Sequence, residues 1–117
     1  MTELQVAVLA VLWELDEAST QDVWQRVGLD RGLALTTVAT ILSRLERRGI
    51  LGYRRVGRQH VHRALVTRAE VRTSKIRELT EVLFDGDPVE LLGHVVESEE
   101  ISAEGVRRLR AALRRAG

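Results

Sequence analysis

The stretch LTTVATILSRLERRGILGYRRVGRQHVHR, residues 35–63, decides the fold of this chain. In its first half, apolar residues recur every three or four positions, and hydroxyl and guanidinium groups fill positions between them. This spacing places the two sets on opposite faces of a helix over about residues 35–48. Hydroxyls and guanidiniums reach base edges and phosphates in a major groove, so the polar face is typical of a DNA recognition helix. The apolar face holds Val38, Ile41, Leu42 and Leu45, and the polar face holds Thr36, Thr37, Thr40, Ser43, Arg44 and Arg47.

The second half of the stretch predicts a basic β-hairpin. Gly49 ends the helix, and the sequence ILGYRRVGRQHVHR follows, with Gly57 and Arg58 at the expected turn. Glycine favours such turns because it adopts backbone conformations that other residues avoid. The flanking strands carry Arg54, Arg55 and Arg63. A recognition helix joined directly to a basic hairpin is typical of a winged helix-turn-helix.

Length and composition limit what else the chain can be. Its 117 residues suffice for one domain, or one small domain with an appendage, and 44% of them are hydrophobic. Cysteine is absent, which excludes disulfides and thiolate metal chemistry. The longest apolar run, Val6 to Trp13, is far too short for a membrane span, and no basic segment precedes it as in a signal peptide. We therefore expect a cytoplasmic protein without membrane insertion.

The positive charge is concentrated in the predicted helix and hairpin. The formal net charge is only +1, but residues 44–63 contain seven arginines and a single carboxylate, Glu46. Residues 1–43 contain two arginines and six acids. A clustered basic patch matters more for nucleic-acid binding than the total charge, so this distribution favours DNA as the partner over a merely solvated charged face.

Two further helices are predicted ahead of the recognition helix. Thr2 and Gln5 form a capping box for a helix that runs to about Leu15, and Asp16 to Ala18 is a polar break. Ser19 caps a second helix, which ends at Gly28. Three helices and a hairpin complete a winged helix-turn-helix domain over residues 1–66, with Trp13 and Trp24 in its core. The inward positions of the first helix are Leu4, Ala7, Val8, Val11, Leu12 and Leu15.

Residues 67–117 predict three amphipathic helices. The first begins at a Thr67–Glu70 capping box and runs to about Phe84, Pro88 suits the first turn of the second, and Ser102 caps the third. So short a segment has too little mass for a secure core. Its apolar faces must pack against the first domain or against a second copy, and we favour the second copy. The predicted dimerisation residues are Val71, Ile76, Leu79, Val82, Leu83, Leu91, Leu92, Val95, Val106, Leu109 and Leu113.

The chain resembles the penicillinase repressor family, the BlaI/MecI/CopY group of bacterial winged-helix repressors. The resemblance covers nearly the whole chain, and its most specific part is the pattern of threonines and arginines ahead of a wing with Gly57 and Arg58 at its tip. It implies a mostly α-helical homodimer that represses transcription at dyad operators with TACA/TGTA-like half-sites, under a β-lactam or cell-envelope signal. The stretches that carry it are VLAVLWEL (8–15), TTVATILSRLERRGIL (36–51), GRQHVHRA (57–64), LLGHVVESEEIS (91–102) and VRRLRAAL (106–113).

The resemblance also implies the DNA contacts. The family's recognition-helix contacts fall on Thr36, Thr37, Thr40 and Arg44, and its wing contact falls on Arg58. The residue chemistry agrees, because a threonine can meet a thymine methyl group or a base edge and an arginine can bond a guanine. Ser43 lies on the same face and joins this groove-facing set. Arg47, Arg54 and Arg55 are interpreted as phosphate partners, which set orientation and affinity without reading sequence.

Three features depart from the family pattern. The copper-responsive branch uses a C-terminal cysteine motif, which this chain lacks. In the β-lactam branch, a membrane sensor leads to cutting of an Asn-Phe bond in the dimerisation domain. The matching residues here are His94 and Val95, so cleavage at that bond is not carried over, although the region stays a candidate for a regulatory protease.

Third, His60 and His62 stand where the family usually has wing aromatics. Two histidines without a third ligand make a weak metal site, so we interpret both as polar wing positions and predict no metal. We hypothesise that their protonation strengthens phosphate contacts.

Other function classes are weighed against this interpretation. The sequence shows no nucleophile elbow, phosphate loop or metal-ligand cluster, so we expect neither an enzyme nor a cofactor. A winged-helix protein-interaction module would generally lack the basic wing. A ligand-sensing repressor of another regulon stays open.

Overall fold

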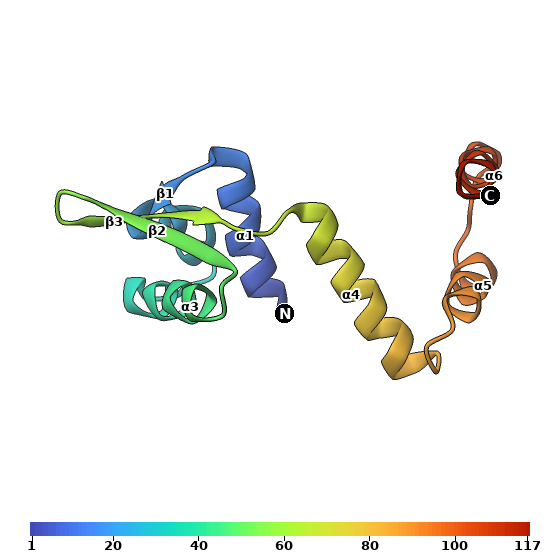
Figure 1. Cartoon of the computed structure of the whole chain (residues 1–117), viewed down its shortest axis with the longest axis horizontal. Helices are drawn as coiled ribbons and strands as arrows, with labels where there is room; N and C mark the ends of the chain where they lie inside the picture. The colour runs from blue at the N-terminus through green and yellow to red at the C-terminus, as the bar shows by residue number, and fades with distance from the viewer. The chain divides into compact units, whose positions relative to one another are not determined.

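The computed structural model describes all 117 residues and divides into two units, Met1–Lys75 and Ile76–Gly117 (Figure 1). The division falls inside helix α4 (Arg68–Leu83), whose first turns therefore belong to the N-terminal unit. The boundary between the two units therefore lies after Lys75, whereas the sequence predicted that the DNA-binding domain ends at residue 66.

The N-terminal unit is the predicted winged helix. It contains α1 (Glu3–Leu15), α2 (Thr20–Val23) with its π-helical continuation η1 (Trp24–Gly28), and α3 (Leu35–Arg47). The hairpin consists of β2 (Leu51–Val56) and β3 (Gln59–Ala64), which pair antiparallel around a two-residue turn. The pairing begins with Leu51 opposite Ala64 and ends with Val56 opposite Gln59. Figure 1 shows this hairpin extending beyond the helices of its unit, as a wing does.

A short strand that the sequence did not predict joins the base of the wing. Strand β1 (Ala18–Ser19) pairs with β3, so that Ala18 lies opposite His62 and Ser19 opposite Val61. The sheet order is β1-β3-β2. The segment expected to be a polar break therefore closes a three-stranded sheet, and Asp16, with a positive φ of 67°, turns the chain into it.

Helix α1 buries a wider face in the core of the N-terminal unit than the sequence predicted. Val8, Val11 and Leu12 are buried as expected, but Leu9 is also fully buried and Leu15 is 36% exposed. The reason is that α1 packs against strand β3 and also against η1, so its buried face exceeds a single helical stripe. The remaining core residues are Ala18, Val23, Val27, Val38, Leu42, Leu45, Leu51 and Val71.

Both tryptophans pack against this core, as predicted. Trp13 donates its indole N–H to the carbonyl oxygen of Val66 at 2.9 Å, and Trp24 donates to the carbonyl of Leu33 at 2.8 Å. Gly28 makes room for the second indole, because a Cβ there would lie 2.6 Å from Trp24 Cδ1. The indoles thus fix the chain at the end of the wing and in the turn before α3.

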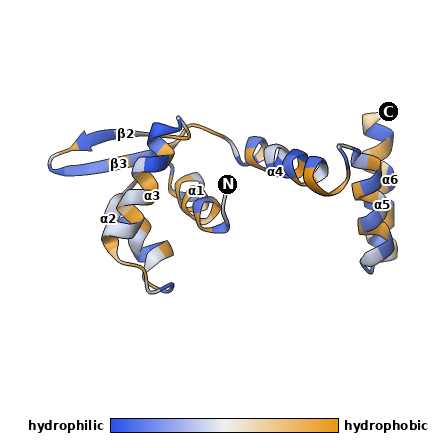
Figure 2. Ribbon diagram, turned by 90° about the horizontal axis from the view of Figure 1, so that it is seen from below, coloured by the Kyte–Doolittle hydropathy of each residue, from blue (hydrophilic) through white to orange (hydrophobic).

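The C-terminal unit contains the end of α4, α5 (Pro88–Ser98) and α6 (Ala103–Ala116). Asp87 and Ser102 cap α5 and α6 through their side-chain oxygens. The three predicted helices are confirmed, but they bury almost nothing, and Thr80 is the sole buried residue of this unit. Figure 2 shows orange apolar patches alternating with blue ones along these helices. None of the chain's helices combines the length and apolar character needed to cross a membrane.

Candidate nucleic-acid interface

Helix α3 presents the predicted recognition face to solvent. Val38, Leu42 and Leu45 are buried on its inner side, where it packs against α2, η1 and β2. Gly49, with φ of 75°, ends the helix and lets the chain turn into β2. All six predicted contact residues of the outer side are exposed: Thr36, Thr37, Thr40, Ser43, Arg44 and Arg47.

One hydroxyl on this face already has a partner. Thr40 donates its Oγ1 hydrogen to the carbonyl oxygen of Thr36 at 2.9 Å. The hydroxyl hydrogen is therefore used within the helix, while the methyl group and an oxygen lone pair stay free. Thr40 can offer DNA an apolar contact and an acceptor, which suits a thymine methyl group or a base amino group.

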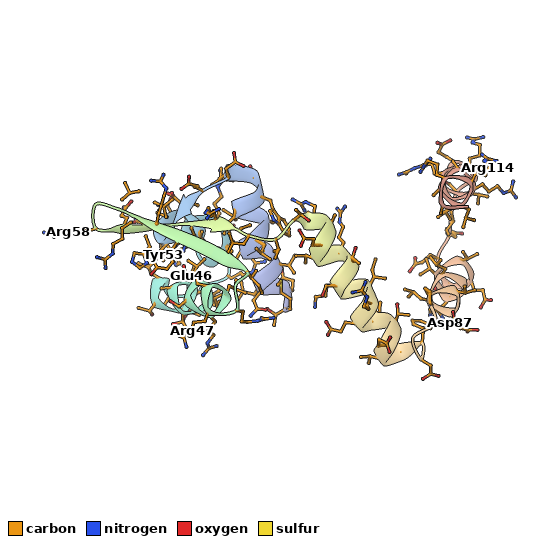
Figure 3. The ribbon with its side chains drawn as sticks, in the orientation of Figure 1. Glu46, Arg47, Tyr53, Arg58, Asp87 and Arg114 are labelled. Carbon is orange, nitrogen blue, oxygen red and sulfur yellow. The ribbon has the colours of Figure 1, made fainter.

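The wing carries Arg58 at its tip, as predicted. Gly57 has φ of 62°, the positive value that a tight two-residue hairpin turn requires at its first central position. Figure 3 shows Arg58 at the end of the wing and Arg47 directed away from α3. No ion pair within the chain engages either guanidinium. Both are therefore available to phosphates.

The two predicted phosphate partners on β2 point to opposite faces of the wing. Successive residues of a strand alternate, so Arg55 shares a face with Tyr53, and Arg54 lies on the other face. Arg54 bonds Glu17 there, with 2.8 Å between Nε and Oε2. The face of Arg55 also carries His62, which contacts α3. Of the pair, Arg55 thus lies on the side of the recognition helix.

His62 is not the exposed wing residue that the sequence suggested. Its side chain is 3% exposed and joins three elements through two hydrogen bonds. The Nδ1 atom lies 2.6 Å from Glu46 Oε1 in α3, and Nε2 lies 2.9 Å from Thr20 Oγ1 at the start of α2. A buried imidazole held in this way cannot strengthen a phosphate contact, so that hypothesis is wrong for His62.

The surroundings of His62 favour its neutral form. Burial lowers the pKa of His62 below its ordinary value of 6.5, although the hydrogen bond and charge of Glu46 act in the opposite direction. In the neutral ring, Nδ1–H donates to the Glu46 carboxylate and Nε2 accepts from the Thr20 hydroxyl. The sequence held one signal of this arrangement: Glu46 is the sole carboxylate of the basic stretch 44–63.

His60 keeps a partly exposed place on the wing. Its ring stacks on Tyr53 with 4.7 Å between centroids and 16° between planes. The two histidines thus share a strand face but have different roles, since His62 is buried in the sheet base and His60 lies nearer the tip. No group of three or more potential metal ligands occurs in the structure.

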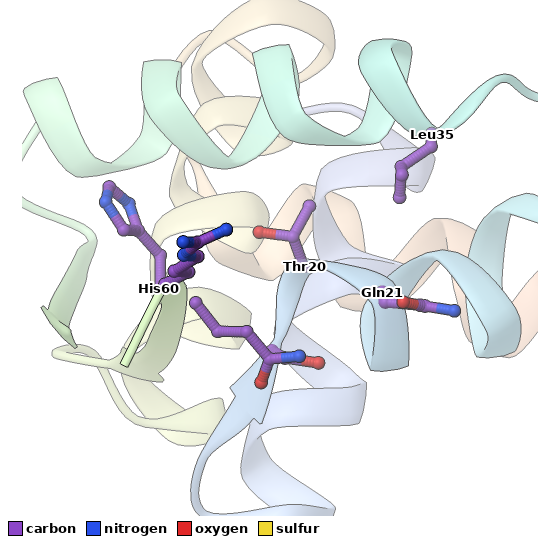
Figure 4. A pocket seen from close by; sticks show the side chains of 7 residues that line it. Thr20, Gln21, Leu35 and His60 are labelled. Atoms are coloured by element: carbon purple, nitrogen blue, oxygen red, sulfur yellow. The ribbon is translucent and has the colours of Figure 1, made fainter. Parts of the chain in front are cut away.

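A hollow of about 300 Å³ lies between the wing and the helices (Figure 4). The first residues of α2, including Thr20 and Gln21, form one side, and Leu35 at the start of α3 forms another. The wing contributes Arg58, Gln59 and His60. Six of the seven residues that line it are polar, and it opens between the two elements expected to contact DNA.

The predicted dimerisation residues divide between the two units. Val71 is 9% exposed and belongs to the core of the N-terminal unit, so it is unavailable to a second copy. The others lie in the C-terminal unit, where Leu91 is half-buried and nine are exposed. His94 and Val95 are exposed within α5, so the bond between them lies inside a helix. The exposed residues are Ile76, Leu79, Val82, Leu83, Leu92, Val95, Val106, Leu109 and Leu113.

A three-helix unit with a hydroxyl- and arginine-bearing helix beside a basic hairpin defines a winged-helix DNA-binding protein. The family model for the penicillinase repressor matches residues 1–115, and the chain belongs to this family. Over 106 residues it is 20% identical to the methicillin resistance regulatory protein MecI of Mammaliicoccus sciuri, covering 91% of this chain and 86% of MecI.

Solved structures agree with the fold. The DNA-binding domain of the repressor BlaI matches with a TM-score of 0.55 at 21% identity, over 60% of this chain and 85% of that domain. The transcriptional regulator PcaV of Streptomyces coelicolor matches with a TM-score of 0.50 at 28% identity, over 98% of this chain and 76% of PcaV. The predicted family and winged-helix fold are confirmed, and the chain is a DNA-binding transcriptional repressor of a family without enzymatic activity.

Proposed function

We propose that the chain acts in the cytoplasm as a homodimer that blocks transcription by occupying a dyad operator with TACA/TGTA-like half-sites. The observation that carries this proposal is the exposed polar face of α3 beside a wing with free arginines. A two-fold dimer presents two such helices, which suits a two-fold symmetric site. The centres of its two half-sites would lie about one helical turn of DNA apart, or a small multiple of that distance.

The contacts divide by chemistry. Thr36, Thr37, Thr40, Ser43 and Arg44 enter the major groove and meet base edges. Arg58 reaches the neighbouring groove from the wing tip. Arg47 and Arg55 bind phosphates and set the orientation on the duplex. Arg54 is the weaker phosphate partner, because Glu17 engages it on the far face of the wing.

The hollow between wing and helices fits this docking. A helix in the major groove and a wing in the adjacent groove must straddle the sugar–phosphate strand that separates the grooves. The hollow lies between these two elements, and Arg58, Gln59 and Gln21 offer donors along it. It therefore supplies room for the backbone where a flat surface would hold the wing away.

Residues 67–117 form the proposed dimerisation domain. Its helices expose nine of the predicted apolar residues, and so small a unit cannot bury them alone. Val71 is not among the proposed dimer contacts, because its side chain is buried in the core of the N-terminal unit. We expect the dimer contacts to begin at Ile76.

Release from DNA is proposed to follow a β-lactam or cell-envelope signal through a membrane sensor and a regulatory protease. The region around His94 and Val95 is exposed, which supports access. Proteases cleave extended segments, so α5 must unwind locally before this region can be cut. Cleavage there would remove dimer contacts rather than DNA contacts.

A ligand-sensing repressor of another regulon is the second candidate. PcaV, which this chain resembles at 25% identity with a TM-score of 0.50 in its ligand-bound structure, has been solved with its natural ligand. Release of the operator on addition of a small molecule, with the chain left uncut, would favour this route. The protein-interaction module is disfavoured by the free arginines of the wing and by the family.

The test is fluorescence anisotropy of a labelled duplex with a TACA/TGTA dyad, compared with a scrambled duplex across a salt series. We expect tight binding to the dyad with two chains per duplex and a steep salt slope, because several arginines displace counterions. Equal and weak binding to both duplexes would refute the proposed half-sites, and selection from random DNA would then define the operator.

A further inference from the structure

Glu46 is the one carboxylate on the recognition helix and the wing, and its position is electrostatically unfavourable. It lies in the last turn of α3, where the partial negative charge of the helix end disfavours a carboxylate. Its neighbours Arg44 and Arg47 form no ion pair with it, and its side-chain partner is His62. Neither the helix dipole nor attraction to DNA therefore explains a carboxylate at this position.

The contact of Glu46 with His62, which we call the Glu46–His62 link, joins the recognition helix to the wing. The Glu46 side chain is 15% exposed, and Figure 3 shows it between α3 and the wing strands. Its Oε1 atom lies 2.6 Å from His62 Nδ1 in β3, while His62 Nε2 lies 2.9 Å from Thr20 Oγ1 in α2. The main packing partners of α3 are α2, η1 and β2, so the link adds a connection from α3 to the second wing strand.

The Glu46–His62 link holds the wing at its base, and Arg55 lies beyond it toward the tip. In the hairpin, His62 is opposite Tyr53, and His60 is opposite Arg55. With a rise of about 3.3 Å per residue, Arg55 is about 7 Å further along the wing. A rotation of the base by about 15° would move the backbone of Arg55 by about 2 Å, which is more than a hydrogen bond to a phosphate tolerates. The place of Arg55 on a duplex therefore depends on how the base is held.

We propose that Glu46 is a positioning residue for operator binding, which acts through His62 to hold the base of the wing in place relative to α3. With the base held, Arg55 meets a phosphate while α3 occupies the major groove. The inference rests on the proposed function, in which both elements contact one duplex. Freedom of the wing relative to α3 would have to be lost on binding, and this loss would lower the affinity. The Glu46–His62 link removes that freedom before DNA is bound.

Two conservative variants separate the reach of the Glu46 side chain from its charge. Burial lowers the pKa of His62 and favours the neutral ring, so Nδ1–H needs an acceptor but no negative charge. Glu46→Gln keeps a carbonyl oxygen at the same reach and loses the charge. Glu46→Asp keeps the charge, but its side chain is one methylene shorter. The link should therefore persist in Glu46→Gln and be lost in Glu46→Asp.

The experiment is a double-mutant cycle between Glu46 and Arg55, which share no hydrogen bond or ion pair. Arg55→Ala is made in full-length wild-type, Glu46→Gln and Glu46→Asp chains. Fluorescence anisotropy across a salt series measures binding to the duplex that the wild type binds most tightly. In the wild type and Glu46→Gln, Arg55→Ala should weaken binding about fivefold near 100 mM salt and reduce the salt slope by about one phosphate contact. In Glu46→Asp, it should weaken binding less than about twofold and leave the slope unchanged, because the wing no longer holds Arg55 at its phosphate.

The matched control is Val71→Ala, which removes packing from the core of the same unit and leaves the Glu46–His62 link in place. This variant lowers the stability of the unit without freeing the wing from α3. Arg55→Ala should therefore weaken binding by the same factor in the Val71→Ala chain as in the wild type. Urea unfolding checks that every variant is folded under the conditions of the binding measurement.

The outcomes separate this inference from the proposed function. An effect of Arg55→Ala that disappears in Glu46→Asp alone supports the positioning role. An equal effect in all four backgrounds overturns the positioning role and leaves the proposed wing contact standing. An effect that also disappears in Glu46→Gln or in Val71→Ala overturns it too, because charge or stability would then account for the loss. If Arg55→Ala changes nothing in the wild type, the proposed phosphate contact of Arg55 fails, and the positioning role fails with it.

Discussion

Arg44 is the residue on which sequence-specific reading should depend most. It is exposed on α3 and forms no ion pair within the chain, so its guanidinium is free to bond a guanine edge. We expect Arg44→Ala to weaken operator binding by about 1–3 kcal/mol and to relax the preference at one base pair. Anisotropy with operator duplexes substituted at each position measures both effects. Equal loss on specific and random DNA would place Arg44 among the phosphate contacts instead.

His62 gives the N-terminal unit a pH-dependent stability. Because burial holds the pKa of His62 below 6.5, the unfolded chain takes up this proton before the folded chain does. The contribution is therefore complete above about pH 6.5 and is lost as the pH falls toward the folded-state pKa. Urea unfolding of wild type and His62→Gln at pH 7.5 and 5.5 tests this. The wild type should lose more stability than the variant on acidification, while His60→Gln should behave like wild type.

At the scale of elements, strand alternation in the wing separates two neighbouring arginines. Arg55 lies on the face that also contacts α3, and Arg54 lies on the other face with Glu17. Arg55→Ala should weaken all duplexes alike and reduce the salt slope by about one phosphate contact. Arg54→Ala is the matched control and should change affinity less. Equal losses in the two variants would show that DNA contacts both faces of the wing.

The elements that the sequence predicted well are those set by local signals. The Thr2–Gln5 and Thr67–Glu70 capping boxes, Gly49 at the end of α3 and Gly57 at the wing turn all depend on neighbours within a few residues. The exposed face of α3 follows from helical periodicity in the same way.

What the sequence did not reveal depends on segments meeting in space. The two residues of β1 are too few to show a pattern, and their pairing exists because the base of β3 lies beside them. His62 is buried because α2, α3 and β3 converge on it. Leu9 and Val71 are buried for the same kind of reason, since packing from a second side extends the core beyond one stripe.

At the scale of the whole molecule, helix α4 is shared between the two units. Its first turns belong to the winged helix, and the rest belongs to the C-terminal unit. Val71 fills the N-terminal core, Trp13 bonds the carbonyl of Val66, and the Arg68 guanidinium lies 4.8 Å from the centre of the Trp13 ring. A fragment of residues 1–75 should therefore fold as a stable monomer. A fragment of residues 1–65 should be about 2–3 kcal/mol less stable, because it lacks the Val71 packing and the Trp13 hydrogen bond.

Chemical denaturation of the two fragments measures that difference, and sedimentation measures their association. Both fragments should bind the operator much more weakly than the full chain, because each lacks the helices that we propose form the dimer. A fragment of residues 1–75 that sedimented as a dimer would contradict the role given to the C-terminal unit. Equal stabilities would show that the start of α4 adds nothing to the winged helix.

The pairing of β1 with β3 divides the wing into a stiff base and a compliant tip. Three strands hold the chain at Val61 and His62, but beyond them β2 and β3 have only each other. A two-stranded ribbon is marginal in water, so amide hydrogens near Gly57 should exchange with solvent much faster than those at the base. The flexible tip can therefore place Arg58 in grooves of differing width while α3 stays in the same position in the major groove. We expect operator sequences that narrow or widen the neighbouring groove to lower the affinity of this repressor only slightly.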